Sequence, residues 1–322
     1  MDALQFSQLL LDKFPFQPTD SQQLAIKQLS EFLFTESNNT LFVLKGYAGT
    51  GKTTLIASIV KNLRYANHKS VLLAPTGRAA KVLSNYAKKQ AFTIHKRIYF
   101  PRSGKDGKVG FVLQPNKFSN TLFVIDEASM IGDASTQSKL FESGSLLQDL
   151  ISFVDAGTNC RLMFVGDTAQ LPPVKLTVSP ALNSDLLAFD FNKDVSEVVL
   201  SEVVRQSEGS GILHNATALR EQLQIEIFDD FCFNLKPFND VIRLIDGHEI
   251  QEAIESSYRN NGKEETVILV RSNKRANLYN QQIRSQILFN EHELSVGDFL
   301  MVVKNNYYWL EASSAPGFIA NG

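Results

Sequence analysis

The chain has 322 residues, of which 43% are hydrophobic and 20% are charged, and it contains 10 prolines. This composition excludes disordered and fibrous proteins. At ~150 residues per domain, the length predicts two domains, each large enough to exclude a small scaffold held together by disulfides or metals. The formal net charge of −2 does not by itself indicate a polyanionic partner. No apolar run approaches the ~18 residues of a membrane-spanning helix, and the first residues do not resemble a signal peptide. Cys160 and Cys232 form no C-x-x-C pair, which fits a reducing compartment. Together with the missing apolar segments, this leads us to expect a cytoplasmic protein with no membrane partner.

Short apolar runs alternate along the chain with longer segments of helical period, and this alternation predicts an α/β fold with parallel strands. The expected strands lie at residues 41–44, 71–74, 122–125, 162–165 and 267–270. Between the first two, a stripe from Leu55 to Leu63 indicates a helix that is buried on one side. The mixed stretch at 183–194 is the expected boundary between a first domain, residues 1–190, and a second domain, residues 191–322.

Two segments interrupt this alternation. From Ile98 to Leu113 the sequence reads strand, glycine-containing turn, strand, which predicts a small hairpin inserted at about 98–119. From about residue 294, short apolar runs predict the start of a small β unit, and we expect the chain to be cut short inside it.

Residues Gly46 to Thr53 match the pattern G-x-x-x-x-G-K-[ST], directly after one expected strand and directly before the striped helix. In such a loop the backbone N–H groups surround phosphates, Lys52 reaches the β and γ phosphates, and the Thr53 hydroxyl ligates Mg²⁺. The alternative is a glycine-rich turn without a ligand. The pattern predicts a site for ATP and Mg²⁺, with nucleotide-binding residues Gly46, Ala48, Gly49, Thr50, Gly51, Lys52, Thr53 and Thr54.

Polar residues follow two further apolar strands, where parallel sheets place their ligands. Asp126 follows the strand at 122–125 and is expected to hold Mg²⁺ together with Thr53, while Glu127 is the candidate for polarising the attacking water. A pair of helix-capping acids is the alternative. Gln170 follows the strand at 162–165 and can sense a γ-phosphate or align water, although a turn residue near two prolines is the simpler interpretation.

Basic residues are concentrated in one part of the chain. The segment from Lys61 to Lys108 holds 12 basic residues against one acid, Asp106, which gives it a charge of +11. Such a segregated field attracts phosphates, and a solvated basic face is the alternative.

These motifs, in this order, resemble the superfamily 1B DNA helicases of the RecD-like or Dda-like group, from about Thr19 to the last residue. The resemblance implies that Gln22, in the segment 19–25, recognises adenine. It also implies that Arg205, in the segment 200–206, reaches the γ-phosphate from a second RecA-like domain. The segments 74–81 and 93–95 resemble motifs that hold a single-stranded backbone, and the implied DNA contacts are Thr76, Gly77, Arg78, Thr93, His95 and Lys96.

The resemblance further implies a P-loop NTPase with two RecA-like domains, in which the inserted hairpin takes the place of a strand-separating pin. The implied activity is ATP-dependent movement 5′ to 3′ on single-stranded DNA in repair or recombination, with a nuclease or replication protein as a possible partner. The family continues past an F-x-x-N-G segment, here residues 318–322, through a small barrel and two more motifs that have no counterpart in this chain. We therefore expect nucleotide binding by this chain to survive better than robust unwinding.

Three other functions stay open at this stage. The first is a nucleotide-switched DNA-binding subunit of a nuclease or repair complex, without unwinding activity of its own. The second is an RNA translocase, because motifs that grip only the backbone separate RNA from DNA poorly. The third, a small-molecule kinase, leaves Gln170, Arg205 and the basic segment without a role. We predict no nuclease chemistry.

Overall fold

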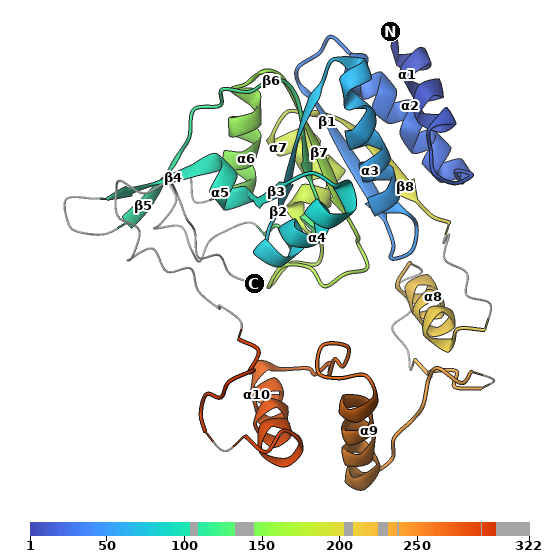
Figure 1. Cartoon of the computed structure of the whole chain (residues 1–322). Helices are drawn as coiled ribbons and strands as arrows, with labels where there is room; N and C mark the ends of the chain where they lie inside the picture. Colours follow the sequence, from blue (N-terminus) through green and yellow to red (C-terminus); the bar gives the residue numbers. More distant parts are fainter. Residues whose placement is uncertain are drawn as a thin grey trace. The chain divides into compact units, whose positions relative to one another are not determined.

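The computed structural model describes residues 1–103, 109–132, 145–202, 209–224, 231–236, 238–290 and 292–300. The chain divides into two compact units, of which the first contains residues 1–206 and the second contains residues 207–300. They are called unit 1 and unit 2 below, and each is described by itself (Figure 1). Within the described ranges, no helix is both long enough and apolar enough to cross a membrane.

Unit 1 is built on a sheet of six strands in the order β3-β2-β6-β7-β1-β8. Every neighbouring pair in this sheet is parallel. The strands are β1 (Thr40–Gly46), β2 (Lys69–Ala74), β3 (Ala91–Thr93), β6 (Ser119–Ile125), β7 (Thr158–Gly166) and β8 (Asp194–Leu200). The predicted α/β class is confirmed, and the first four predicted strands lie within β1, β2, β6 and β7.

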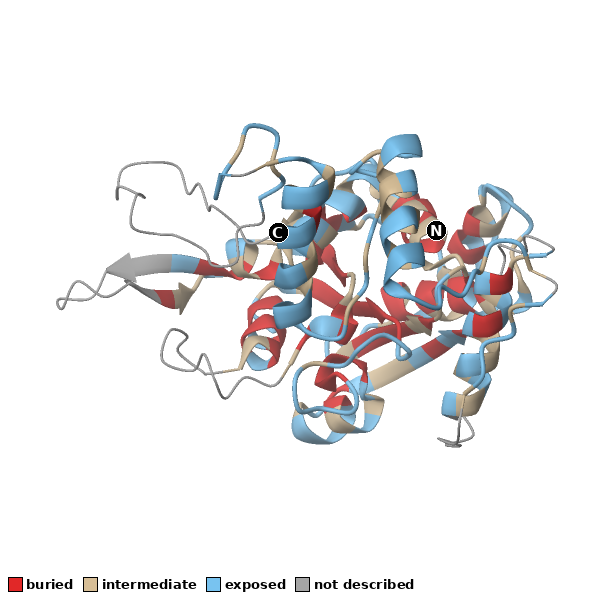
Figure 2. Cartoon of the chain, turned by 90° about the horizontal axis from the view of Figure 1, so that it is seen from below, coloured by how far each residue is buried: buried red, intermediate tan, exposed pale blue. Residues whose placement is uncertain are grey.

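Successive side chains of each central strand enter two different cores, as the two-residue period of a strand requires. In β1, Leu41 and Val43 belong to one core, whereas Phe42 and Leu44 belong to the other. Helix α6 packs into the first core and helices α1, α2 and α3 into the second, so the strands are buried between them (Figure 2). Burial on both faces explains why these strands read as continuous apolar runs.

The helices of unit 1 are α1 (Ala3–Asp12), α2 (Asp20–Phe34), α3 (Lys52–Asn62), α4 (Gly77–Ala87), α5 (Ile94–Ile98), α6 (Leu146–Asp155) and α7 (Ser184–Asp190). Short 3₁₀ helices occupy Leu63–Ala66, Ala128–Met130 and Pro180–Leu182. The apolar stripe that the sequence predicts is buried, at Leu55, Ile56 and Ile59 on α3 and at Leu63 in the turn that follows the helix.

Strand β8 lies beyond the expected domain boundary near residue 190. It pairs with β1 from Thr40 opposite Asp194 to Gly46 opposite Leu200. The mixed stretch that suggested a boundary contains the short helix α7, which leads directly into this strand. The chain therefore leaves unit 1 only after its sixth strand.

The predicted hairpin is confirmed. Strands β4 (Tyr99–Ser103) and β5 (Val109–Leu113) pair antiparallel, with Tyr99 opposite Leu113. The Tyr99 hydroxyl donates a hydrogen bond of 2.6 Å to Oδ2 of Asp149 on α6, which anchors the base of the hairpin to unit 1.

Unit 2 contains helices α8 (Gly211–Gln224), α9 (Gly247–Asn260) and α10 (Asn273–Gln282), followed by a π-helical turn at Ile283–Ile287. The prediction of a strand at 267–270 is wrong, because these residues pair with no neighbouring strand and the side chains of Val267 and Leu269 are exposed. No strand occurs among the described residues of unit 2. The predicted second RecA-like sheet stays a prediction, and most of the β unit expected from residue 294 lies outside the described residues.

Arg161 on β7 is a buried cation that joins helix α2 to the sheet, with 4% of its surface exposed. Its Nη1 donates to the carbonyl oxygen of Ser37 at 3.1 Å and to the hydroxyl of Thr40 at 3.0 Å. Its Nη2 donates to the carbonyl oxygen of Thr35, the residue that caps the carboxyl end of α2. The guanidinium thereby satisfies the Thr35 carbonyl at the end of α2, which the helix leaves without a partner, and holds the segment that leads into β1.

We therefore expect Arg161→Met to lower the free energy of unfolding by about 3 kcal/mol, because hydrogen bonds from a buried, charged donor are lost. Chemical denaturation followed by far-ultraviolet circular dichroism measures this loss. Arg64→Met, at an exposed arginine after α3, is the matched control and should change stability little. Equal losses in the two variants would contradict the assignment.

Candidate nucleotide-binding site

The parallel sheet brings the predicted site residues to one edge, because the carboxyl ends of parallel strands lie side by side. Neighbouring strands are about 4.8 Å apart, so residues far apart in the sequence become neighbours there. In sheet order the segments that follow the strands are 93–96 after β3, 76–78 after β2, 126–127 after β6, 167–170 after β7 and 46–54 after β1. The predicted DNA contacts lie at the β3 and β2 end of this edge, and the predicted nucleotide contacts lie at the β1 end.

The loop between β1 and α3 has the backbone shape that its glycines predict. Gly49 and Gly51 have φ angles of 85° and 83°, in the left-handed region that favours glycine, and Gly51 caps α3. A Cβ atom on Gly46 would lie 2.8 Å from Oγ1 of Thr50 and 3.0 Å from Cβ of Leu200. The loop thus leads its backbone into the amino terminus of α3, where N–H groups bind anions.

Lys52 lies over this loop. Its Nζ donates to the carbonyl oxygen of Tyr47 at 2.8 Å and to that of Gly46, and it lies 4.0 Å from Oδ2 of Asp167. Asp167 is buried at the end of β7, and its Oδ1 accepts a hydrogen bond from the N–H of Ala169 at 2.9 Å. The site-residue prediction omits Asp167, although an acid directly after an apolar strand is the same signal that identifies Asp126.

Gln22 holds the phosphate loop from helix α2. Its Nε2 donates to the carbonyl oxygen of Thr50 at 2.9 Å, and its Oε1 accepts from the N–H of Thr19 at 3.1 Å. The side chain is buried, and both ends of its amide are bonded within the protein. In this structure Gln22 positions the loop, and its recognition of adenine stays a prediction.

Glu202 is a second residue that the site prediction misses. Its Oε1 accepts from the N–H of Ser21 at 3.3 Å, and its Oε2 accepts from the hydroxyls of Ser21 and Thr19. The hydrogen bond from the Ser21 hydroxyl is the main reason that the pKa of Glu202 lies below its usual value. The carboxylate thereby ties the end of β8 to the first turn of α2, the turn that carries Gln22.

Asp126 and Glu127 lie where β6 ends. The pKa of Asp126 is raised to about 6, chiefly by burial and also by the charge of Glu127, while a hydrogen bond from the Glu127 N–H and the nearby Lys52 oppose the increase. Glu127 has a φ angle of 55°, a left-handed conformation that is uncommon for a side chain of this size. Strained residues of this kind are concentrated at functional sites.

Gln170 connects the β6 and β7 segments, because its Oε1 accepts a hydrogen bond of 2.9 Å from the hydroxyl of Ser129. Its side chain is exposed at the edge, while Ser129 is buried. Arg205, the predicted partner for the γ-phosphate, lies outside the described residues.

The two threonines among the predicted DNA contacts are helix caps. Thr76 accepts from the N–H of Ala79 at 3.2 Å at the start of α4, and Thr93 accepts from the N–H of Lys96 at 3.3 Å at the start of α5. Burial lowers the pKa of His95, which favours the neutral imidazole. Lys96 and Arg78 are exposed, so these two cations are available to phosphates at the edge.

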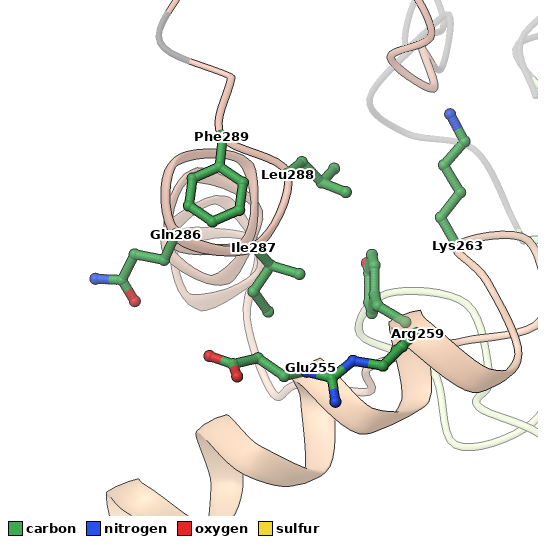
Figure 3. Close-up of a pocket in the computed structure, with 8 residues that line it drawn as sticks. Glu255, Arg259, Lys263, Gln286, Ile287, Leu288 and Phe289 are labelled. Carbon is green, nitrogen blue, oxygen red and sulfur yellow. The ribbon is translucent and has the colours of Figure 1, made fainter.

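Unit 2 contains an open cavity of about 440 Å³ between the end of α9 and residues 286–289 (Figure 3). One carboxylate, two cations and apolar side chains are among the groups that line it, including Glu255, Arg259, Lys263, Ile287 and Phe289. None of the predicted site residues lines this cavity.

The sheet, the loop and the acids after β6 and β7 define a P-loop nucleotide-binding protein. A family model described as an AAA domain matches residues 18–230. The chain belongs to this AAA-domain family, and its relatives place it with the RecD- and Dda-like helicases of superfamily 1B. The family recognised from the sequence is therefore confirmed.

Three relatives illustrate this similarity. The ATP-dependent RecD2 DNA helicase of Deinococcus radiodurans is 30% identical over 183 residues, which cover 57% of this chain and 22% of the relative. The ATP-dependent DNA helicase Dda of Enterobacteria phage T4 is 30% identical over 181 residues, covering 55% of this chain and 37% of the relative. The uncharacterized protein R530 of Acanthamoeba polyphaga mimivirus is 27% identical over 320 residues, covering 89% of this chain and 60% of the relative. The matched region is thus at most 60% of the length of these relatives.

The raised pKa of Asp126 predicts how stability depends on pH. Because the folded protein holds this proton more tightly than the unfolded chain does, the free energy of unfolding falls as the pH rises from 3.8, the ordinary value, through about 6. Without metal, Asp126→Asn should remove this fall and stabilise the protein by about 2 kcal/mol near neutral pH, after allowance for solvent screening of a half-buried group.

Denaturant titrations of both proteins at a series of pH values measure the difference. Asp190→Asn, at an exposed aspartate on α7, is the control and should parallel the unsubstituted protein. If the free energies of unfolding of Asp126→Asn and of the unsubstituted protein differ by the same amount at every pH, the Asp126 carboxyl group has the same pKa in the folded and unfolded states.

Proposed function

We propose that this protein is an ATP-dependent motor that moves 5′ to 3′ along single-stranded DNA. One observation carries the proposal: a phosphate loop, two adjacent acids and two exposed cations follow neighbouring strands at a single edge of the sheet. Its relatives RecD2 and Dda are named ATP-dependent DNA helicases. The two free cysteines suit a reducing cytoplasm, and a nuclease or replication protein as partner belongs to the same proposal.

The residues of the loop fit ATP and Mg²⁺. The left-handed glycines leave the backbone N–H groups and the amino terminus of α3 to hold the phosphates, and Lys52 would exchange its two carbonyl partners for phosphate oxygens. Thr53 and Asp126 offer the hydroxyl and carboxylate oxygens that Mg²⁺ prefers. When bound, Mg²⁺ neutralises charge on the phosphates, and it would also favour the ionised form of Asp126 against the effect of burial.

Three side chains would then act on the hydrolytic step. Glu127, next to Asp126, would accept the proton of the attacking water. Gln170, which Ser129 holds in place, would align that water or contact the γ-phosphate. Arg205 would stabilise the developing charge, as the resemblance implies.

The DNA would lie along the β2 and β3 end of the edge. Lys96 and Arg78 would pair with phosphates, and Thr76, Gly77, Thr93 and His95 would contact the sugar–phosphate backbone without reading the sequence. The DNA strand would then lie beside the nucleotide at the same edge of the sheet. Hydrolysis of the nucleotide could therefore change the contacts that the protein makes with the DNA backbone. Competition for binding between DNA and RNA strands of the same sequence tests the proposal that the bound strand is DNA.

Steady-state ATP hydrolysis, measured with and without a single-stranded oligonucleotide, tests the proposal. We expect the strand to stimulate hydrolysis about tenfold or more, a usual size for coupling between two sites. Lys52→Ala should reduce the rate by at least about a hundredfold, because a charge that contacts the transferred phosphate is lost.

Lys61→Ala, at an exposed lysine on the same helix α3, is the matched control and should keep the stimulated rate. ATP binding without any stimulation by DNA would contradict a coupled motor and would favour the nucleotide-switched subunit.

Glu127→Gln separates binding from chemistry. We expect this variant to bind ATP as tightly as the unsubstituted protein while hydrolysis falls by about 10²–10⁴-fold, the usual contribution of a general base. Binding of a fluorescent nucleotide and single-turnover hydrolysis measure the two quantities. Glu31→Gln, at an exposed glutamate on α2, is the control. Full turnover by Glu127→Gln would rule out Glu127 as the base.

A further inference from the structure

Helix α4 has one face packed on the sheet and one face open to solvent. Ala80 and Leu83 are buried, whereas five residues at helical spacing point outward. We call these five residues the α4 face: Arg78, Lys81, Val82, Asn85 and Tyr86. Val82 and Tyr86, one turn apart, are 47% and 56% exposed, and the two cations lie beside them. An apolar and aromatic stripe therefore runs along a positively charged helix surface.

This face has no negative charge within its own region of the chain. No aspartate or glutamate occurs between Glu36 and Asp106, a stretch that includes α3, α4 and α5. In the part of the chain that the structure describes, neither Arg78 nor Lys81 forms an ion pair. The charge of the α4 face is thus left for a partner, and the matching partner is a polyanion.

The aromatic stripe narrows the choice of polyanion. An exposed ring between cations fits a single nucleic acid strand, whose unpaired bases stack on aromatic side chains while its phosphates pair with cations. In a duplex the base faces are covered by their neighbours, so the ring of Tyr86 would gain nothing. An acidic protein would use the cations but not the stacking surface.

The α4 face also continues the proposed strand path. Arg78 belongs both to the edge of the sheet and to this face, and the nine residues from Arg78 to Tyr86 extend about 12 Å along the helix. A strand held at the edge can therefore continue along α4 without crossing an acidic region of this segment.

We propose that the α4 face is a further single-strand binding surface, on which Tyr86 stacks against an unpaired base and Lys81 pairs with a phosphate. This inference rests on the proposed function and extends its DNA site from the edge of the sheet onto the outer surface of unit 1. It assigns a role to Tyr86, which lies outside the segments that resemble DNA-binding motifs, and a phosphate contact to Lys81, the last residue of the segment 74–81.

Binding of the 322-residue chain to a fluorescently labelled oligodeoxythymidylate, measured by anisotropy over a range of salt concentrations, tests the proposal. Tyr86→Ala should weaken binding about tenfold, the usual effect of removing one stacking platform. Lys81→Gln should reduce the slope of log K against log salt by about 0.7, because one fewer counterion is released from a single strand.

Phe189→Ala is the matched control, since Phe189 is an 89% exposed aromatic on α7, a helix outside the acid-free stretch. It should leave DNA affinity unchanged. Thermal melting and fluorescent-nucleotide binding should be the same in all variants, because the substituted side chains are exposed. An oligonucleotide carrying 5-iododeoxyuridine should also form a photochemical crosslink to Tyr86 that mass spectrometry locates.

Lys96→Ala separates this inference from the proposed function. If Lys96→Ala weakens binding while Tyr86→Ala and Lys81→Gln have no effect, the edge of the sheet binds DNA and the α4 face does not, which overturns the inference alone. If the unsubstituted chain binds no single strand, the proposed function fails as well. Weaker binding by Tyr86→Ala together with the crosslink supports the inference.

Discussion

Parallel pairing of the six strands in unit 1 is the constraint on which the rest of the site depends. Every strand must return to the same end of the sheet before it pairs, so each carboxyl end reaches one edge and each following loop is placed beside the others. The chain can therefore keep its polar residues in separate motifs, each after a buried apolar strand. Burial of β1 between two cores fixes the position of the phosphate loop, because Leu41 and Phe42 cannot change faces without moving apolar surface into water.

Helix α2 links the parts of this edge that the strands do not connect directly. Gln22 holds the carbonyl of Thr50, Glu202 holds the first turn of the helix from the end of β8, and Arg161 holds its carboxyl end from β7. Both ends of α2 are thus tied to the sheet by polar contacts, while one side of the helix packs into the core. Glu202 contacts Ser21, and the next residue, Gln22, contacts the phosphate loop. A displacement of the end of β8 would therefore be transmitted to the phosphate loop through the first turn of α2.

The sequence by itself determined the α/β class, the first four strands, the hairpin and the phosphate loop. Each depends on local information, because strand and helix periods and the glycines at positions 49 and 51 act over a few residues. It also determined the family, since the motifs occur in a fixed order. It misplaced a strand at 267–270, where apolar residues suggested a strand but the described part of unit 2 provides no partner strand.

Only the tertiary structure decided which side chains meet. The Asp167 carboxylate is 4.0 Å from Lys52 because β7 is the neighbour of β1, although 115 positions separate the two residues in the sequence. Glu202 contacts Ser21 for the same kind of reason, because β8 completes the sheet beside β1. The raised pKa of Asp126 likewise follows from burial and charges that no local pattern contains. Strand order is set by long-range packing, and this explains why the sequence supplied the chemical groups whereas the fold supplied their distances.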